Sequence, residues 1–385
     1  MSTPVPLPSV PRLGPPDEAE ARLLLCGVVS AVVPASGLTD LQRMLIEATF
    51  DAMTGFSPPC STAREVTAAD FALGLADRDE AFRTRILQVM LLAALVLRPL
   101  PQEIADRVDG FARALSVDDG MLAVARRYAS GQLGLAAFDF QRNGYTADWS
   151  ADRAAALHTS TELAGAWDQV VHDTDLAERW RALESLAPGT LGRSVVDFYQ
   201  ARGFAYPGLP GSAPPLLAQH DWVHVLAEYG STVEAELEVF ALIARANDDP
   251  RGFSLLAMVV SLFETGYLRT GAGLFESSPG QLSHAGAAVR VADAMRRGAL
   301  AHTSESPSID FLDVDWFSLA ELPVAEVQRH FGIEAKGAKA IAAGSVGPFE
   351  PGGISPFQDR HGREVAAEAG REYDAYGAAV IEPTD

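Results

Sequence analysis

Residues 220–236 read HDWVHVLAEYGSTVEAE and carry His220, Asp221, His224 and, after eleven further residues, Glu236. If the first part of this stretch is helical, the two histidines lie four residues apart and stack on one face of the helix. Asp221 then lies about 100° around the helix axis from His220, within reach of the same point. The stretch therefore predicts a helix that directs three polar side chains to one place.

The residues that follow His224 predict a tight corner and a second helix. We interpret Gly230 as a left-handed terminator of the first helix. Ser231 and Glu234 have the spacing of a capping box that opens the next helix. Glu236 would then lie in the first turns of that helix, folded back against the first. This stretch predicts a helix–corner–helix unit in which all four side chains meet.

Such a set of side chains suits a divalent metal. Imidazole nitrogen and carboxylate oxygen bind Zn²⁺ at about 2.0–2.2 Å, and the same ligands suit Fe²⁺, Mn²⁺ or Co²⁺. Two neutral histidines and two carboxylates balance the charge of the cation, which permits partial burial. Histidine pairs at this spacing also occur by chance as surface or capping residues, and spacing alone leaves that alternative open.

The same motif, His-Asp-x-x-His followed after eleven residues by Glu, resembles the signature of the Coq-four family of coenzyme Q (ubiquinone) biosynthesis proteins. Flanking segments agree in the same order, at 187–198 upstream and at 294–298 and 315–333 downstream. The resemblance covers about residues 180–334. Ala235 departs from it, because members commonly have Gly before the Glu, and the corner at 228–232 also differs.

This resemblance implies that His220, Asp221, His224 and Glu236 hold a divalent metal, usually taken as zinc. The family is described as acting where the ring carboxyl group of a prenylated aromatic precursor is replaced by hydroxyl, and as organising other quinone-biosynthesis enzymes at a membrane. We therefore expect a metal-dependent decarboxylase or hydroxylase whose partners are that precursor and those enzymes. One alternative is a non-catalytic scaffold with a structural metal that binds the lipid intermediate. Another is a metal-dependent phosphohydrolase, although its additional His and Asp cannot be placed.

Composition narrows the function further. The chain of 385 residues has 51 acidic against 30 basic residues, a formal charge of −21. This balance argues against nucleic acid and against broad adhesion to anionic lipid, while local apolar contact with a membrane stays open. The N-terminus lacks the basic start of a signal peptide, and no apolar run reaches the ~20 residues of a spanning helix. We expect a cytoplasmic protein, peripheral to a membrane at most. Cys26 and Cys60 are interpreted as inert thiols, with a disulfide between them as the alternative.

Apolar spacing indicates an all-α fold of two helical bundles. Helical periodicity is clear over 41–48 and 82–93. The stretch 41–47, with the later 115–119, resembles the TerB-like (tellurite-resistance) helical domain, whose members are linked to metal or membrane-associated complexes; Asp118 and Asp119 are interpreted as helix caps. The expected organisation is a proline-rich arm at 1–20, a TerB-like domain at 21–150, a Coq-four-like domain with the metal motif at 151–336, and an extended tail at 337–385.

Three further expectations concern packing. The apolar stretch 255–267 predicts a core helix or, alternatively, one wall of a groove for a prenyl tail, lined by Leu255, Met258, Val259 and Leu262. Trp222 is expected to shield the site or to pack on the neighbouring bundle. The tail is expected to wrap a partner subunit, which predicts a homo-oligomer. The histidines outside the motif, His172 and His284 among them, are expected to face solvent.

Overall fold

The computed structural model describes residues 14–97, 100–117, 173–210, 212–213, 215–247, 286–375 and the single residues 256 and 284. Within these ranges it contains fourteen α-helices, two short 3-10 helices and no strand. The prediction of an all-α fold is therefore confirmed. Two proposed elements, the domain boundary near residue 150 and the caps at Asp118 and Asp119, lie outside the described residues.

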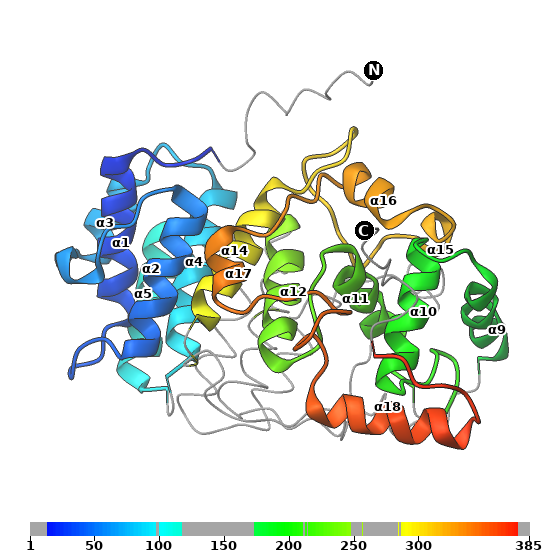
Figure 1. Ribbon diagram of the computed structural model, residues 1–385. Coiled ribbons are helices and arrows are strands. Elements are labelled where there is room, and N and C mark those ends of the chain that lie inside the picture. Colours follow the sequence, from blue (N-terminus) through cyan, green and yellow to red (C-terminus); the bar gives the residue numbers. More distant parts are fainter. Residues whose placement is uncertain are drawn as a thin grey trace.

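Five helices from the N-terminal half pack around their own apolar core (Figure 1). Most begin at a side chain that caps the first turn: Asp17, Thr39, Thr67 and Asp79 each accept a backbone N–H bond. The periodic stretches 41–48 and 82–93 fall inside the second and fourth of these helices, as predicted. The elements are α1 (Glu18–Val32), α2 (Asp40–Thr54), η1 (Cys60–Thr62), α3 (Ala68–Gly74), α4 (Glu80–Leu95) and α5 (Gln102–Leu115).

The C-terminal half has a second core, in which Trp222 and Trp316 are both fully buried. Its helices are α9 (Thr174–Ala182), η2 (Leu183–Ser185), α10 (Leu191–Arg202), α11 (Pro215–Leu226), α12 (Val233–Ala246), α14 (Ala287–Leu300), α15 (Trp316–Leu319), α16 (Val324–His330), α17 (Ala338–Ala342) and α18 (Pro356–Glu368). The sequence motif spans α11, the corner and the start of α12, as the helix–corner–helix prediction requires.

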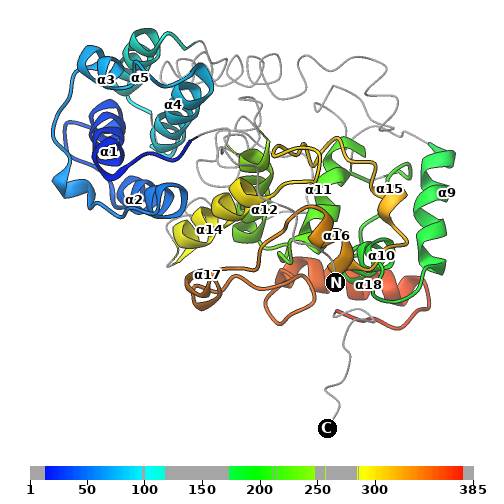
Figure 2. The same cartoon turned by 90° about the horizontal axis from the view of Figure 1, so that it is seen from above.

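The two halves are packed together through α14. Seen from above, this helix lies between α2 of the first half and α12 of the second (Figure 2). Arg85 of α4, itself buried, donates to the carbonyl oxygens of Ala244 and Asn247 at the end of α12. Helix α12, which carries Glu236, is thus held on the side facing the N-terminal bundle.

The terminal segments differ from the prediction. Helix α1 begins at Glu18, inside the predicted arm, and Arg78 donates to the carbonyl oxygens of Gly14 and Pro15. The tail is not extended over its described part, because 338–368 contains α17 and α18, and α18 packs on α10 of the same chain. The signal that was missed is local: Ser355 forms a capping box with Gln358, which starts a helix directly after a glycine-rich loop.

The predicted prenyl groove lies outside the described part of the chain. Leu255, Met258, Val259 and Leu262 lie outside the described residues, and Leu256, the one described position of that stretch, is buried in the second core. Among the helices that are described, none has both the length and the apolar character needed to span a bilayer.

Candidate metal centre

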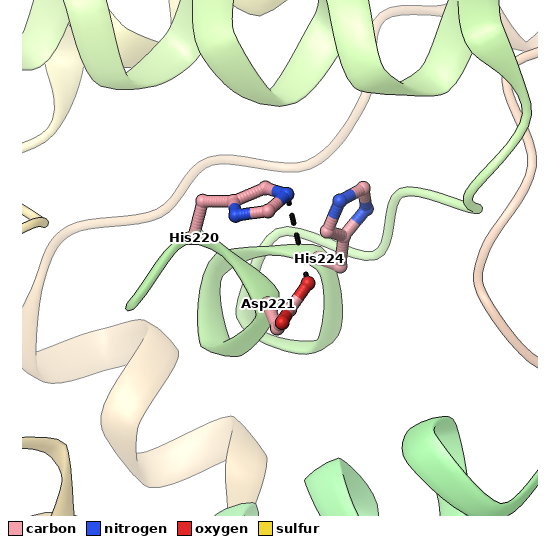
Figure 3. Close-up of side chains that lie close together, drawn as sticks. All are labelled: His220, Asp221 and His224. Carbon is pink, nitrogen blue, oxygen red and sulfur yellow. Dashed lines mark ion pairs between the residues drawn. The ribbon is translucent and has the colours of Figure 1, made fainter. Parts of the chain in front are cut away.

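Helix α11 directs three buried side chains to one point. His220 and His224 project from the same side of the helix with Asp221 beside them (Figure 3). Each residue offers a ligand atom, and these atoms all lie within 4.8 Å of one another. His220 Nε2 is 3.5 Å from Asp221 Oδ1. A buried group of two imidazoles and one carboxylate in this arrangement can hold a metal ion.

Glu236 reaches the same point from α12. Its Oε2 lies 3.3 Å from Nε2 of His220 and 3.3 Å from Nε2 of His224, and the side chain is almost completely buried. The structure therefore brings together all four side chains of the sequence motif. Three come from α11 and one from α12, and the two helices are joined by the predicted corner.

The corner itself is built differently from the prediction. The left-handed residue is Glu228, with φ 59°, and not Gly230. The N–H of Tyr229 bonds to the carbonyl of His224 and that of Glu228 to Val225, which is the paired pattern of a Schellman termination. Thr232, one residue after the predicted Ser231, caps α12 by accepting from the backbone of Ala235.

Two side chains from distant helices hold the end of α11. Arg297 of α14, buried to 1% exposure, donates to the carbonyl oxygen of Ala227 at 2.9 Å. Gln328 of α16 donates to the carbonyl oxygen of Leu226 at 2.9 Å. The last carbonyls of a helix lack partners within it, so these donors fix the end from which the corner departs.

The orientation of both imidazoles is fixed by backbone carbonyls. His220 Nδ1 contacts the carbonyl of Leu217, and His224 Nδ1 lies 2.7 Å from the carbonyl of Gly230. A carbonyl only accepts, so each Nδ1 carries the proton and each neutral ring presents the lone pair of Nε2 to the site. Two lone pairs and the oxygens of Asp221 and Glu236 then converge. All of these atoms are acceptors, and a cation or a proton must lie among them.

The pKa values at the site follow from this crowding. Burial disfavours the charged form of His220, but the neighbouring Asp221 and Glu236 outweigh it and raise its pKa to about 9. Burial also opposes ionisation of Glu236, yet the two imidazoles hold its pKa well below its usual value. Burial raises the pKa of Asp221, against the effect of both imidazoles. The shifts of His220 and Glu236 reflect the attraction between the imidazoles and the carboxylates, and that of Asp221 reflects burial.

Three separations between ligand atoms can be compared with ideal metal geometries. Ligands at about 2.0–2.1 Å from a tetrahedral centre are separated from one another by about 3.4 Å. The three contacts of His220 and His224 with the carboxylates are 3.3, 3.3 and 3.5 Å. Cis ligands of an octahedral centre with similar bonds would stand closer, at about 3.0 Å. The donor set and these three separations are compatible with a divalent cation.

Helix α10 contributes two supporting residues that the sequence analysis did not identify. The hydroxyl of Tyr199 donates to Asp221 Oδ2 at 2.5 Å, and burial, with the Asp221 charge, raises the pKa of this tyrosine. Arg202 is completely buried; burial lowers its pKa to about 9, while the charges of Glu236 and Asp221 act in the opposite direction. The available signal was a tyrosine and an arginine on a helix whose inward positions are mostly apolar.

Trp222 lies away from the candidate ligands. It packs against Trp180, Trp316 and Phe317 of its own half, so neither of its predicted roles, shielding the site or packing on the neighbouring bundle, holds. These aromatic side chains line a pocket of about 190 Å³ whose lining includes none of the four motif residues. Trp222 and Ala218, one helical turn apart, both line this pocket. The face of α11 that they share is opposite the face that carries the two imidazoles.

Of the predictions for His172 and His284, the structure tests only the one for His284. Asp173 caps α9 by accepting from the backbone of Leu176, while His172 lies outside the described residues. His284 has a carboxylate companion after all, because its Nδ1 lies 2.8 Å from Glu234 Oε1. The two residues are 50 positions apart, which no local spacing rule detects. The ring of His284 is more than half exposed, in agreement with the expected solvent-facing position.

Comparisons with protein-family models, with curated proteins and with solved structures each found no match. The resemblances of 180–334 to the Coq-four family and of the N-terminal half to the TerB-like domain therefore stay predictions.

Proposed function

We propose that this protein binds a divalent cation, zinc first among the candidates, through His220, Asp221, His224 and Glu236. One observation carries the proposal: four acceptor groups converge in a buried position, with imidazole tautomers fixed by carbonyls and with three imidazole–carboxylate separations of 3.3, 3.3 and 3.5 Å. Acceptors arranged in this way repel one another unless positive charge lies between them.

The more specific proposal is that the cation serves chemistry on the ring carboxylate of a prenylated aromatic acid. It is supported by the resemblance of 180–334 to the Coq-four family. A divalent cation supplies Lewis-acid stabilisation of negative charge on such a substrate. Among the chain's own residues, Tyr199 would orient Asp221, and the buried charge of Arg202 would limit repulsion between the carboxylates. Other quinone-biosynthesis enzymes and a second copy of this chain stay the expected partners.

A structural metal within a scaffold is the second candidate. It is favoured by the burial of all four residues, none above 5% exposed, and by a complete set of four protein ligands, the usual mark of structural sites. A substrate would need one carboxylate to leave the shell or the shell to expand.

The experiment that tests metal binding is elemental analysis of the purified protein beside a His224→Ala variant. We expect about one equivalent of metal in the wild type and its loss from the variant. His330→Ala, which removes an exposed histidine from α16, is the matched control and should keep the metal. A wild type without bound zinc, iron, manganese or cobalt, and unable to take up any of them, would show the proposal to be wrong.

A second measurement separates the two candidate roles. The wild type and His224→Ala are assayed for carboxyl loss from a prenylated aromatic acid, and the helix content of both is followed after chelation. Activity that disappears with an intact fold supports the enzyme. A fold that melts on chelation, with no activity in either protein, supports the scaffold.

A further inference from the structure

The corner between α11 and α12 rests on a segment from near the C-terminus. The N–H of Gly230 donates to the carbonyl of Val346 at 3.0 Å, and the N–H of Ser231 donates to the carbonyl of Gly353 at 2.8 Å. We call residues 345–358 the strap. Figure 1 shows this orange segment running from α17 past α12 to the start of α18. The strap lies outside the stretch 180–334, so the family resemblance assigns it no role.

A buried chain of side-chain bonds joins the strap to α10 as well. Arg202 donates through Nη2 to the carbonyl oxygens of Pro348 and Gly353, each at 3.1 Å, and through Nε to Ser231 Oγ at 2.6 Å. The hydroxyl of Ser231 in turn donates to Gln358 Oε1 at 2.6 Å. Arg202 and Gln358 are both essentially inaccessible to solvent. Breaking one of these bonds leaves buried polar groups without partners, so the network favours a single docked arrangement.

Glycines allow the strap and the corner to approach each other closely. A Cβ on Gly230 would lie 2.5 Å from the carbonyl oxygen of Gly353. A Cβ on Gly353 would lie 1.9 Å from the carbonyl oxygen of Gly347 within the strap. Both distances are well below van der Waals contact, so backbone packs directly on backbone. A displacement of the strap is therefore passed to the corner without a flexible side chain between them.

One peptide plane connects the strap to a candidate ligand. In the peptide unit between Gly230 and Ser231, the carbonyl oxygen accepts from His224 Nδ1 at 2.7 Å, and the N–H donates to Gly353 at 2.8 Å. A peptide unit is rigid, so fixing its N–H end also fixes the direction of its carbonyl end. That carbonyl sets the tautomer and the ring orientation of His224.

We propose that the strap is a positioning component of the metal centre, which makes strap docking and cation binding mutually stabilising. The inference rests on the proposed metal binding. Coupling of this kind is reciprocal: the factor by which undocking of the strap weakens cation binding equals the factor by which the cation strengthens docking of the strap. Outer partners of metal-bound histidines typically change affinity by about 10–100-fold.

The test uses the full chain with zinc as the probe. Gln358→Ala removes the acceptor of Ser231 from the strap and should weaken zinc binding about ten-fold in a calorimetric titration. Gln42→Ala is the matched control, because it deletes a buried glutamine with two carbonyl partners in the N-terminal half. It should bind zinc like the wild type. Hydrogen exchange of the unmodified protein should show slower exchange across 345–358 when zinc is added.

The outcomes are distinguishable. Wild-type zinc binding with equal affinity in Gln358→Ala, together with strap exchange that zinc does not change, overturns the inference and leaves the proposed function in place. A wild type that binds no zinc removes the proposed function and the inference with it. If Gln358→Ala does not fold, exchange in the wild type with and without zinc decides the matter: slowing of the strap supports the coupling, and unchanged rates refute it.

Discussion

The hydroxyl of Tyr199 provides the sharpest probe of the metal centre, because it touches one candidate ligand and nothing else in the motif. It donates to Asp221 Oδ2 at 2.5 Å inside the protein, a short bond to a charged acceptor. Tyr199→Phe deletes this donor and keeps the ring, which packs between Trp180 and Phe204. The substitution therefore changes one hydrogen bond and little of the packing.

The expected magnitude follows from that bond. A buried hydrogen bond to a charged group contributes about 1.5–3 kcal/mol, and loss of an outer partner of a metal ligand lowers affinity about 10–100-fold, or 1.4–2.8 kcal/mol. These two ranges of free energy agree. We expect Tyr199→Phe to raise the zinc dissociation constant by at least ten-fold. With zinc in excess for both proteins, this reduces the zinc-dependent gain in stability by about 1.4 kcal/mol or more.

The assay is competition for zinc against a chromophoric chelator. Tyr206→Phe is the control: it also removes a hydroxyl from a tyrosine stacked near Trp180, but that hydroxyl donates to Glu184 at 2.9 Å and not to the site. Its zinc affinity should match the wild type. Equal affinities for Tyr199→Phe and the wild type would refute the assignment of Asp221 as an oriented ligand, and equal losses in both variants would point to an indirect packing effect.

Three further changes give separate expectations. Glu236→Gln should lower zinc affinity by more than about 100-fold in the same competition, since it removes a charged ligand. Glu234→Gln, two residues away on α12 and outside the cluster, should leave the affinity unchanged. Equal zinc affinities for the two variants would show that Glu236 is not a ligand. Asp310 has its pKa raised to about 7 by burial, with the charge of Asp313 adding to the effect. The folded state therefore holds this proton more tightly than the unfolded chain, and stability falls as pH rises from about 4 to 7. In urea titrations, Asp310→Asn should be more stable than the wild type by about 1–2 kcal/mol at pH 8 and should show no such gain at pH 3.5. A difference in stability that does not depend on pH would contradict the raised pKa of Asp310. Trp222→Ala should cost about 3–5 kcal/mol in chemical denaturation while keeping one equivalent of metal, and loss of the metal would contradict its separation from the site.

The helix pair and its polar residues were predictable because their signals are local. An i, i+4 pair such as His220 and His224 shares a helix face whatever surrounds it. The turn that follows α11 is also a local signal, and it brings Glu236 on the next helix back beside the two histidines. The details of the corner were not predictable. Gly230 was expected to supply the left-handed residue. Its lack of a side chain instead allows the close approach of Gly353, a residue more than a hundred positions away in the sequence.

The supporting groups were out of reach for a related reason. Tyr199 and Arg202 lie on α10, about twenty residues before the motif, and the strap begins more than a hundred residues after it. Their positions follow from tertiary packing, in which α18 lies against α10 and the strap lies against the corner. A glycine-rich segment such as 344–353 indicates a loop by composition. Composition does not reveal which buried backbone groups that loop will satisfy.

The way the site is supported bears on which role a bound metal has. Small domains that need zinc to fold lack a sufficient apolar core, so binding of the metal supplies their folding energy. Here the half of the chain that carries the motif has a large aromatic core, in which Trp222 and Trp316 are completely buried. Every contact that orients the imidazoles and Asp221 is made by protein groups: carbonyls for the two rings and a tyrosine hydroxyl for the carboxylate. We expect a frame that stands on such contacts to stay folded when the proposed cation is removed, and to bind that cation with little loss of conformational entropy. Preorganisation of this kind favours a metal that serves binding or chemistry over one that holds the helices together.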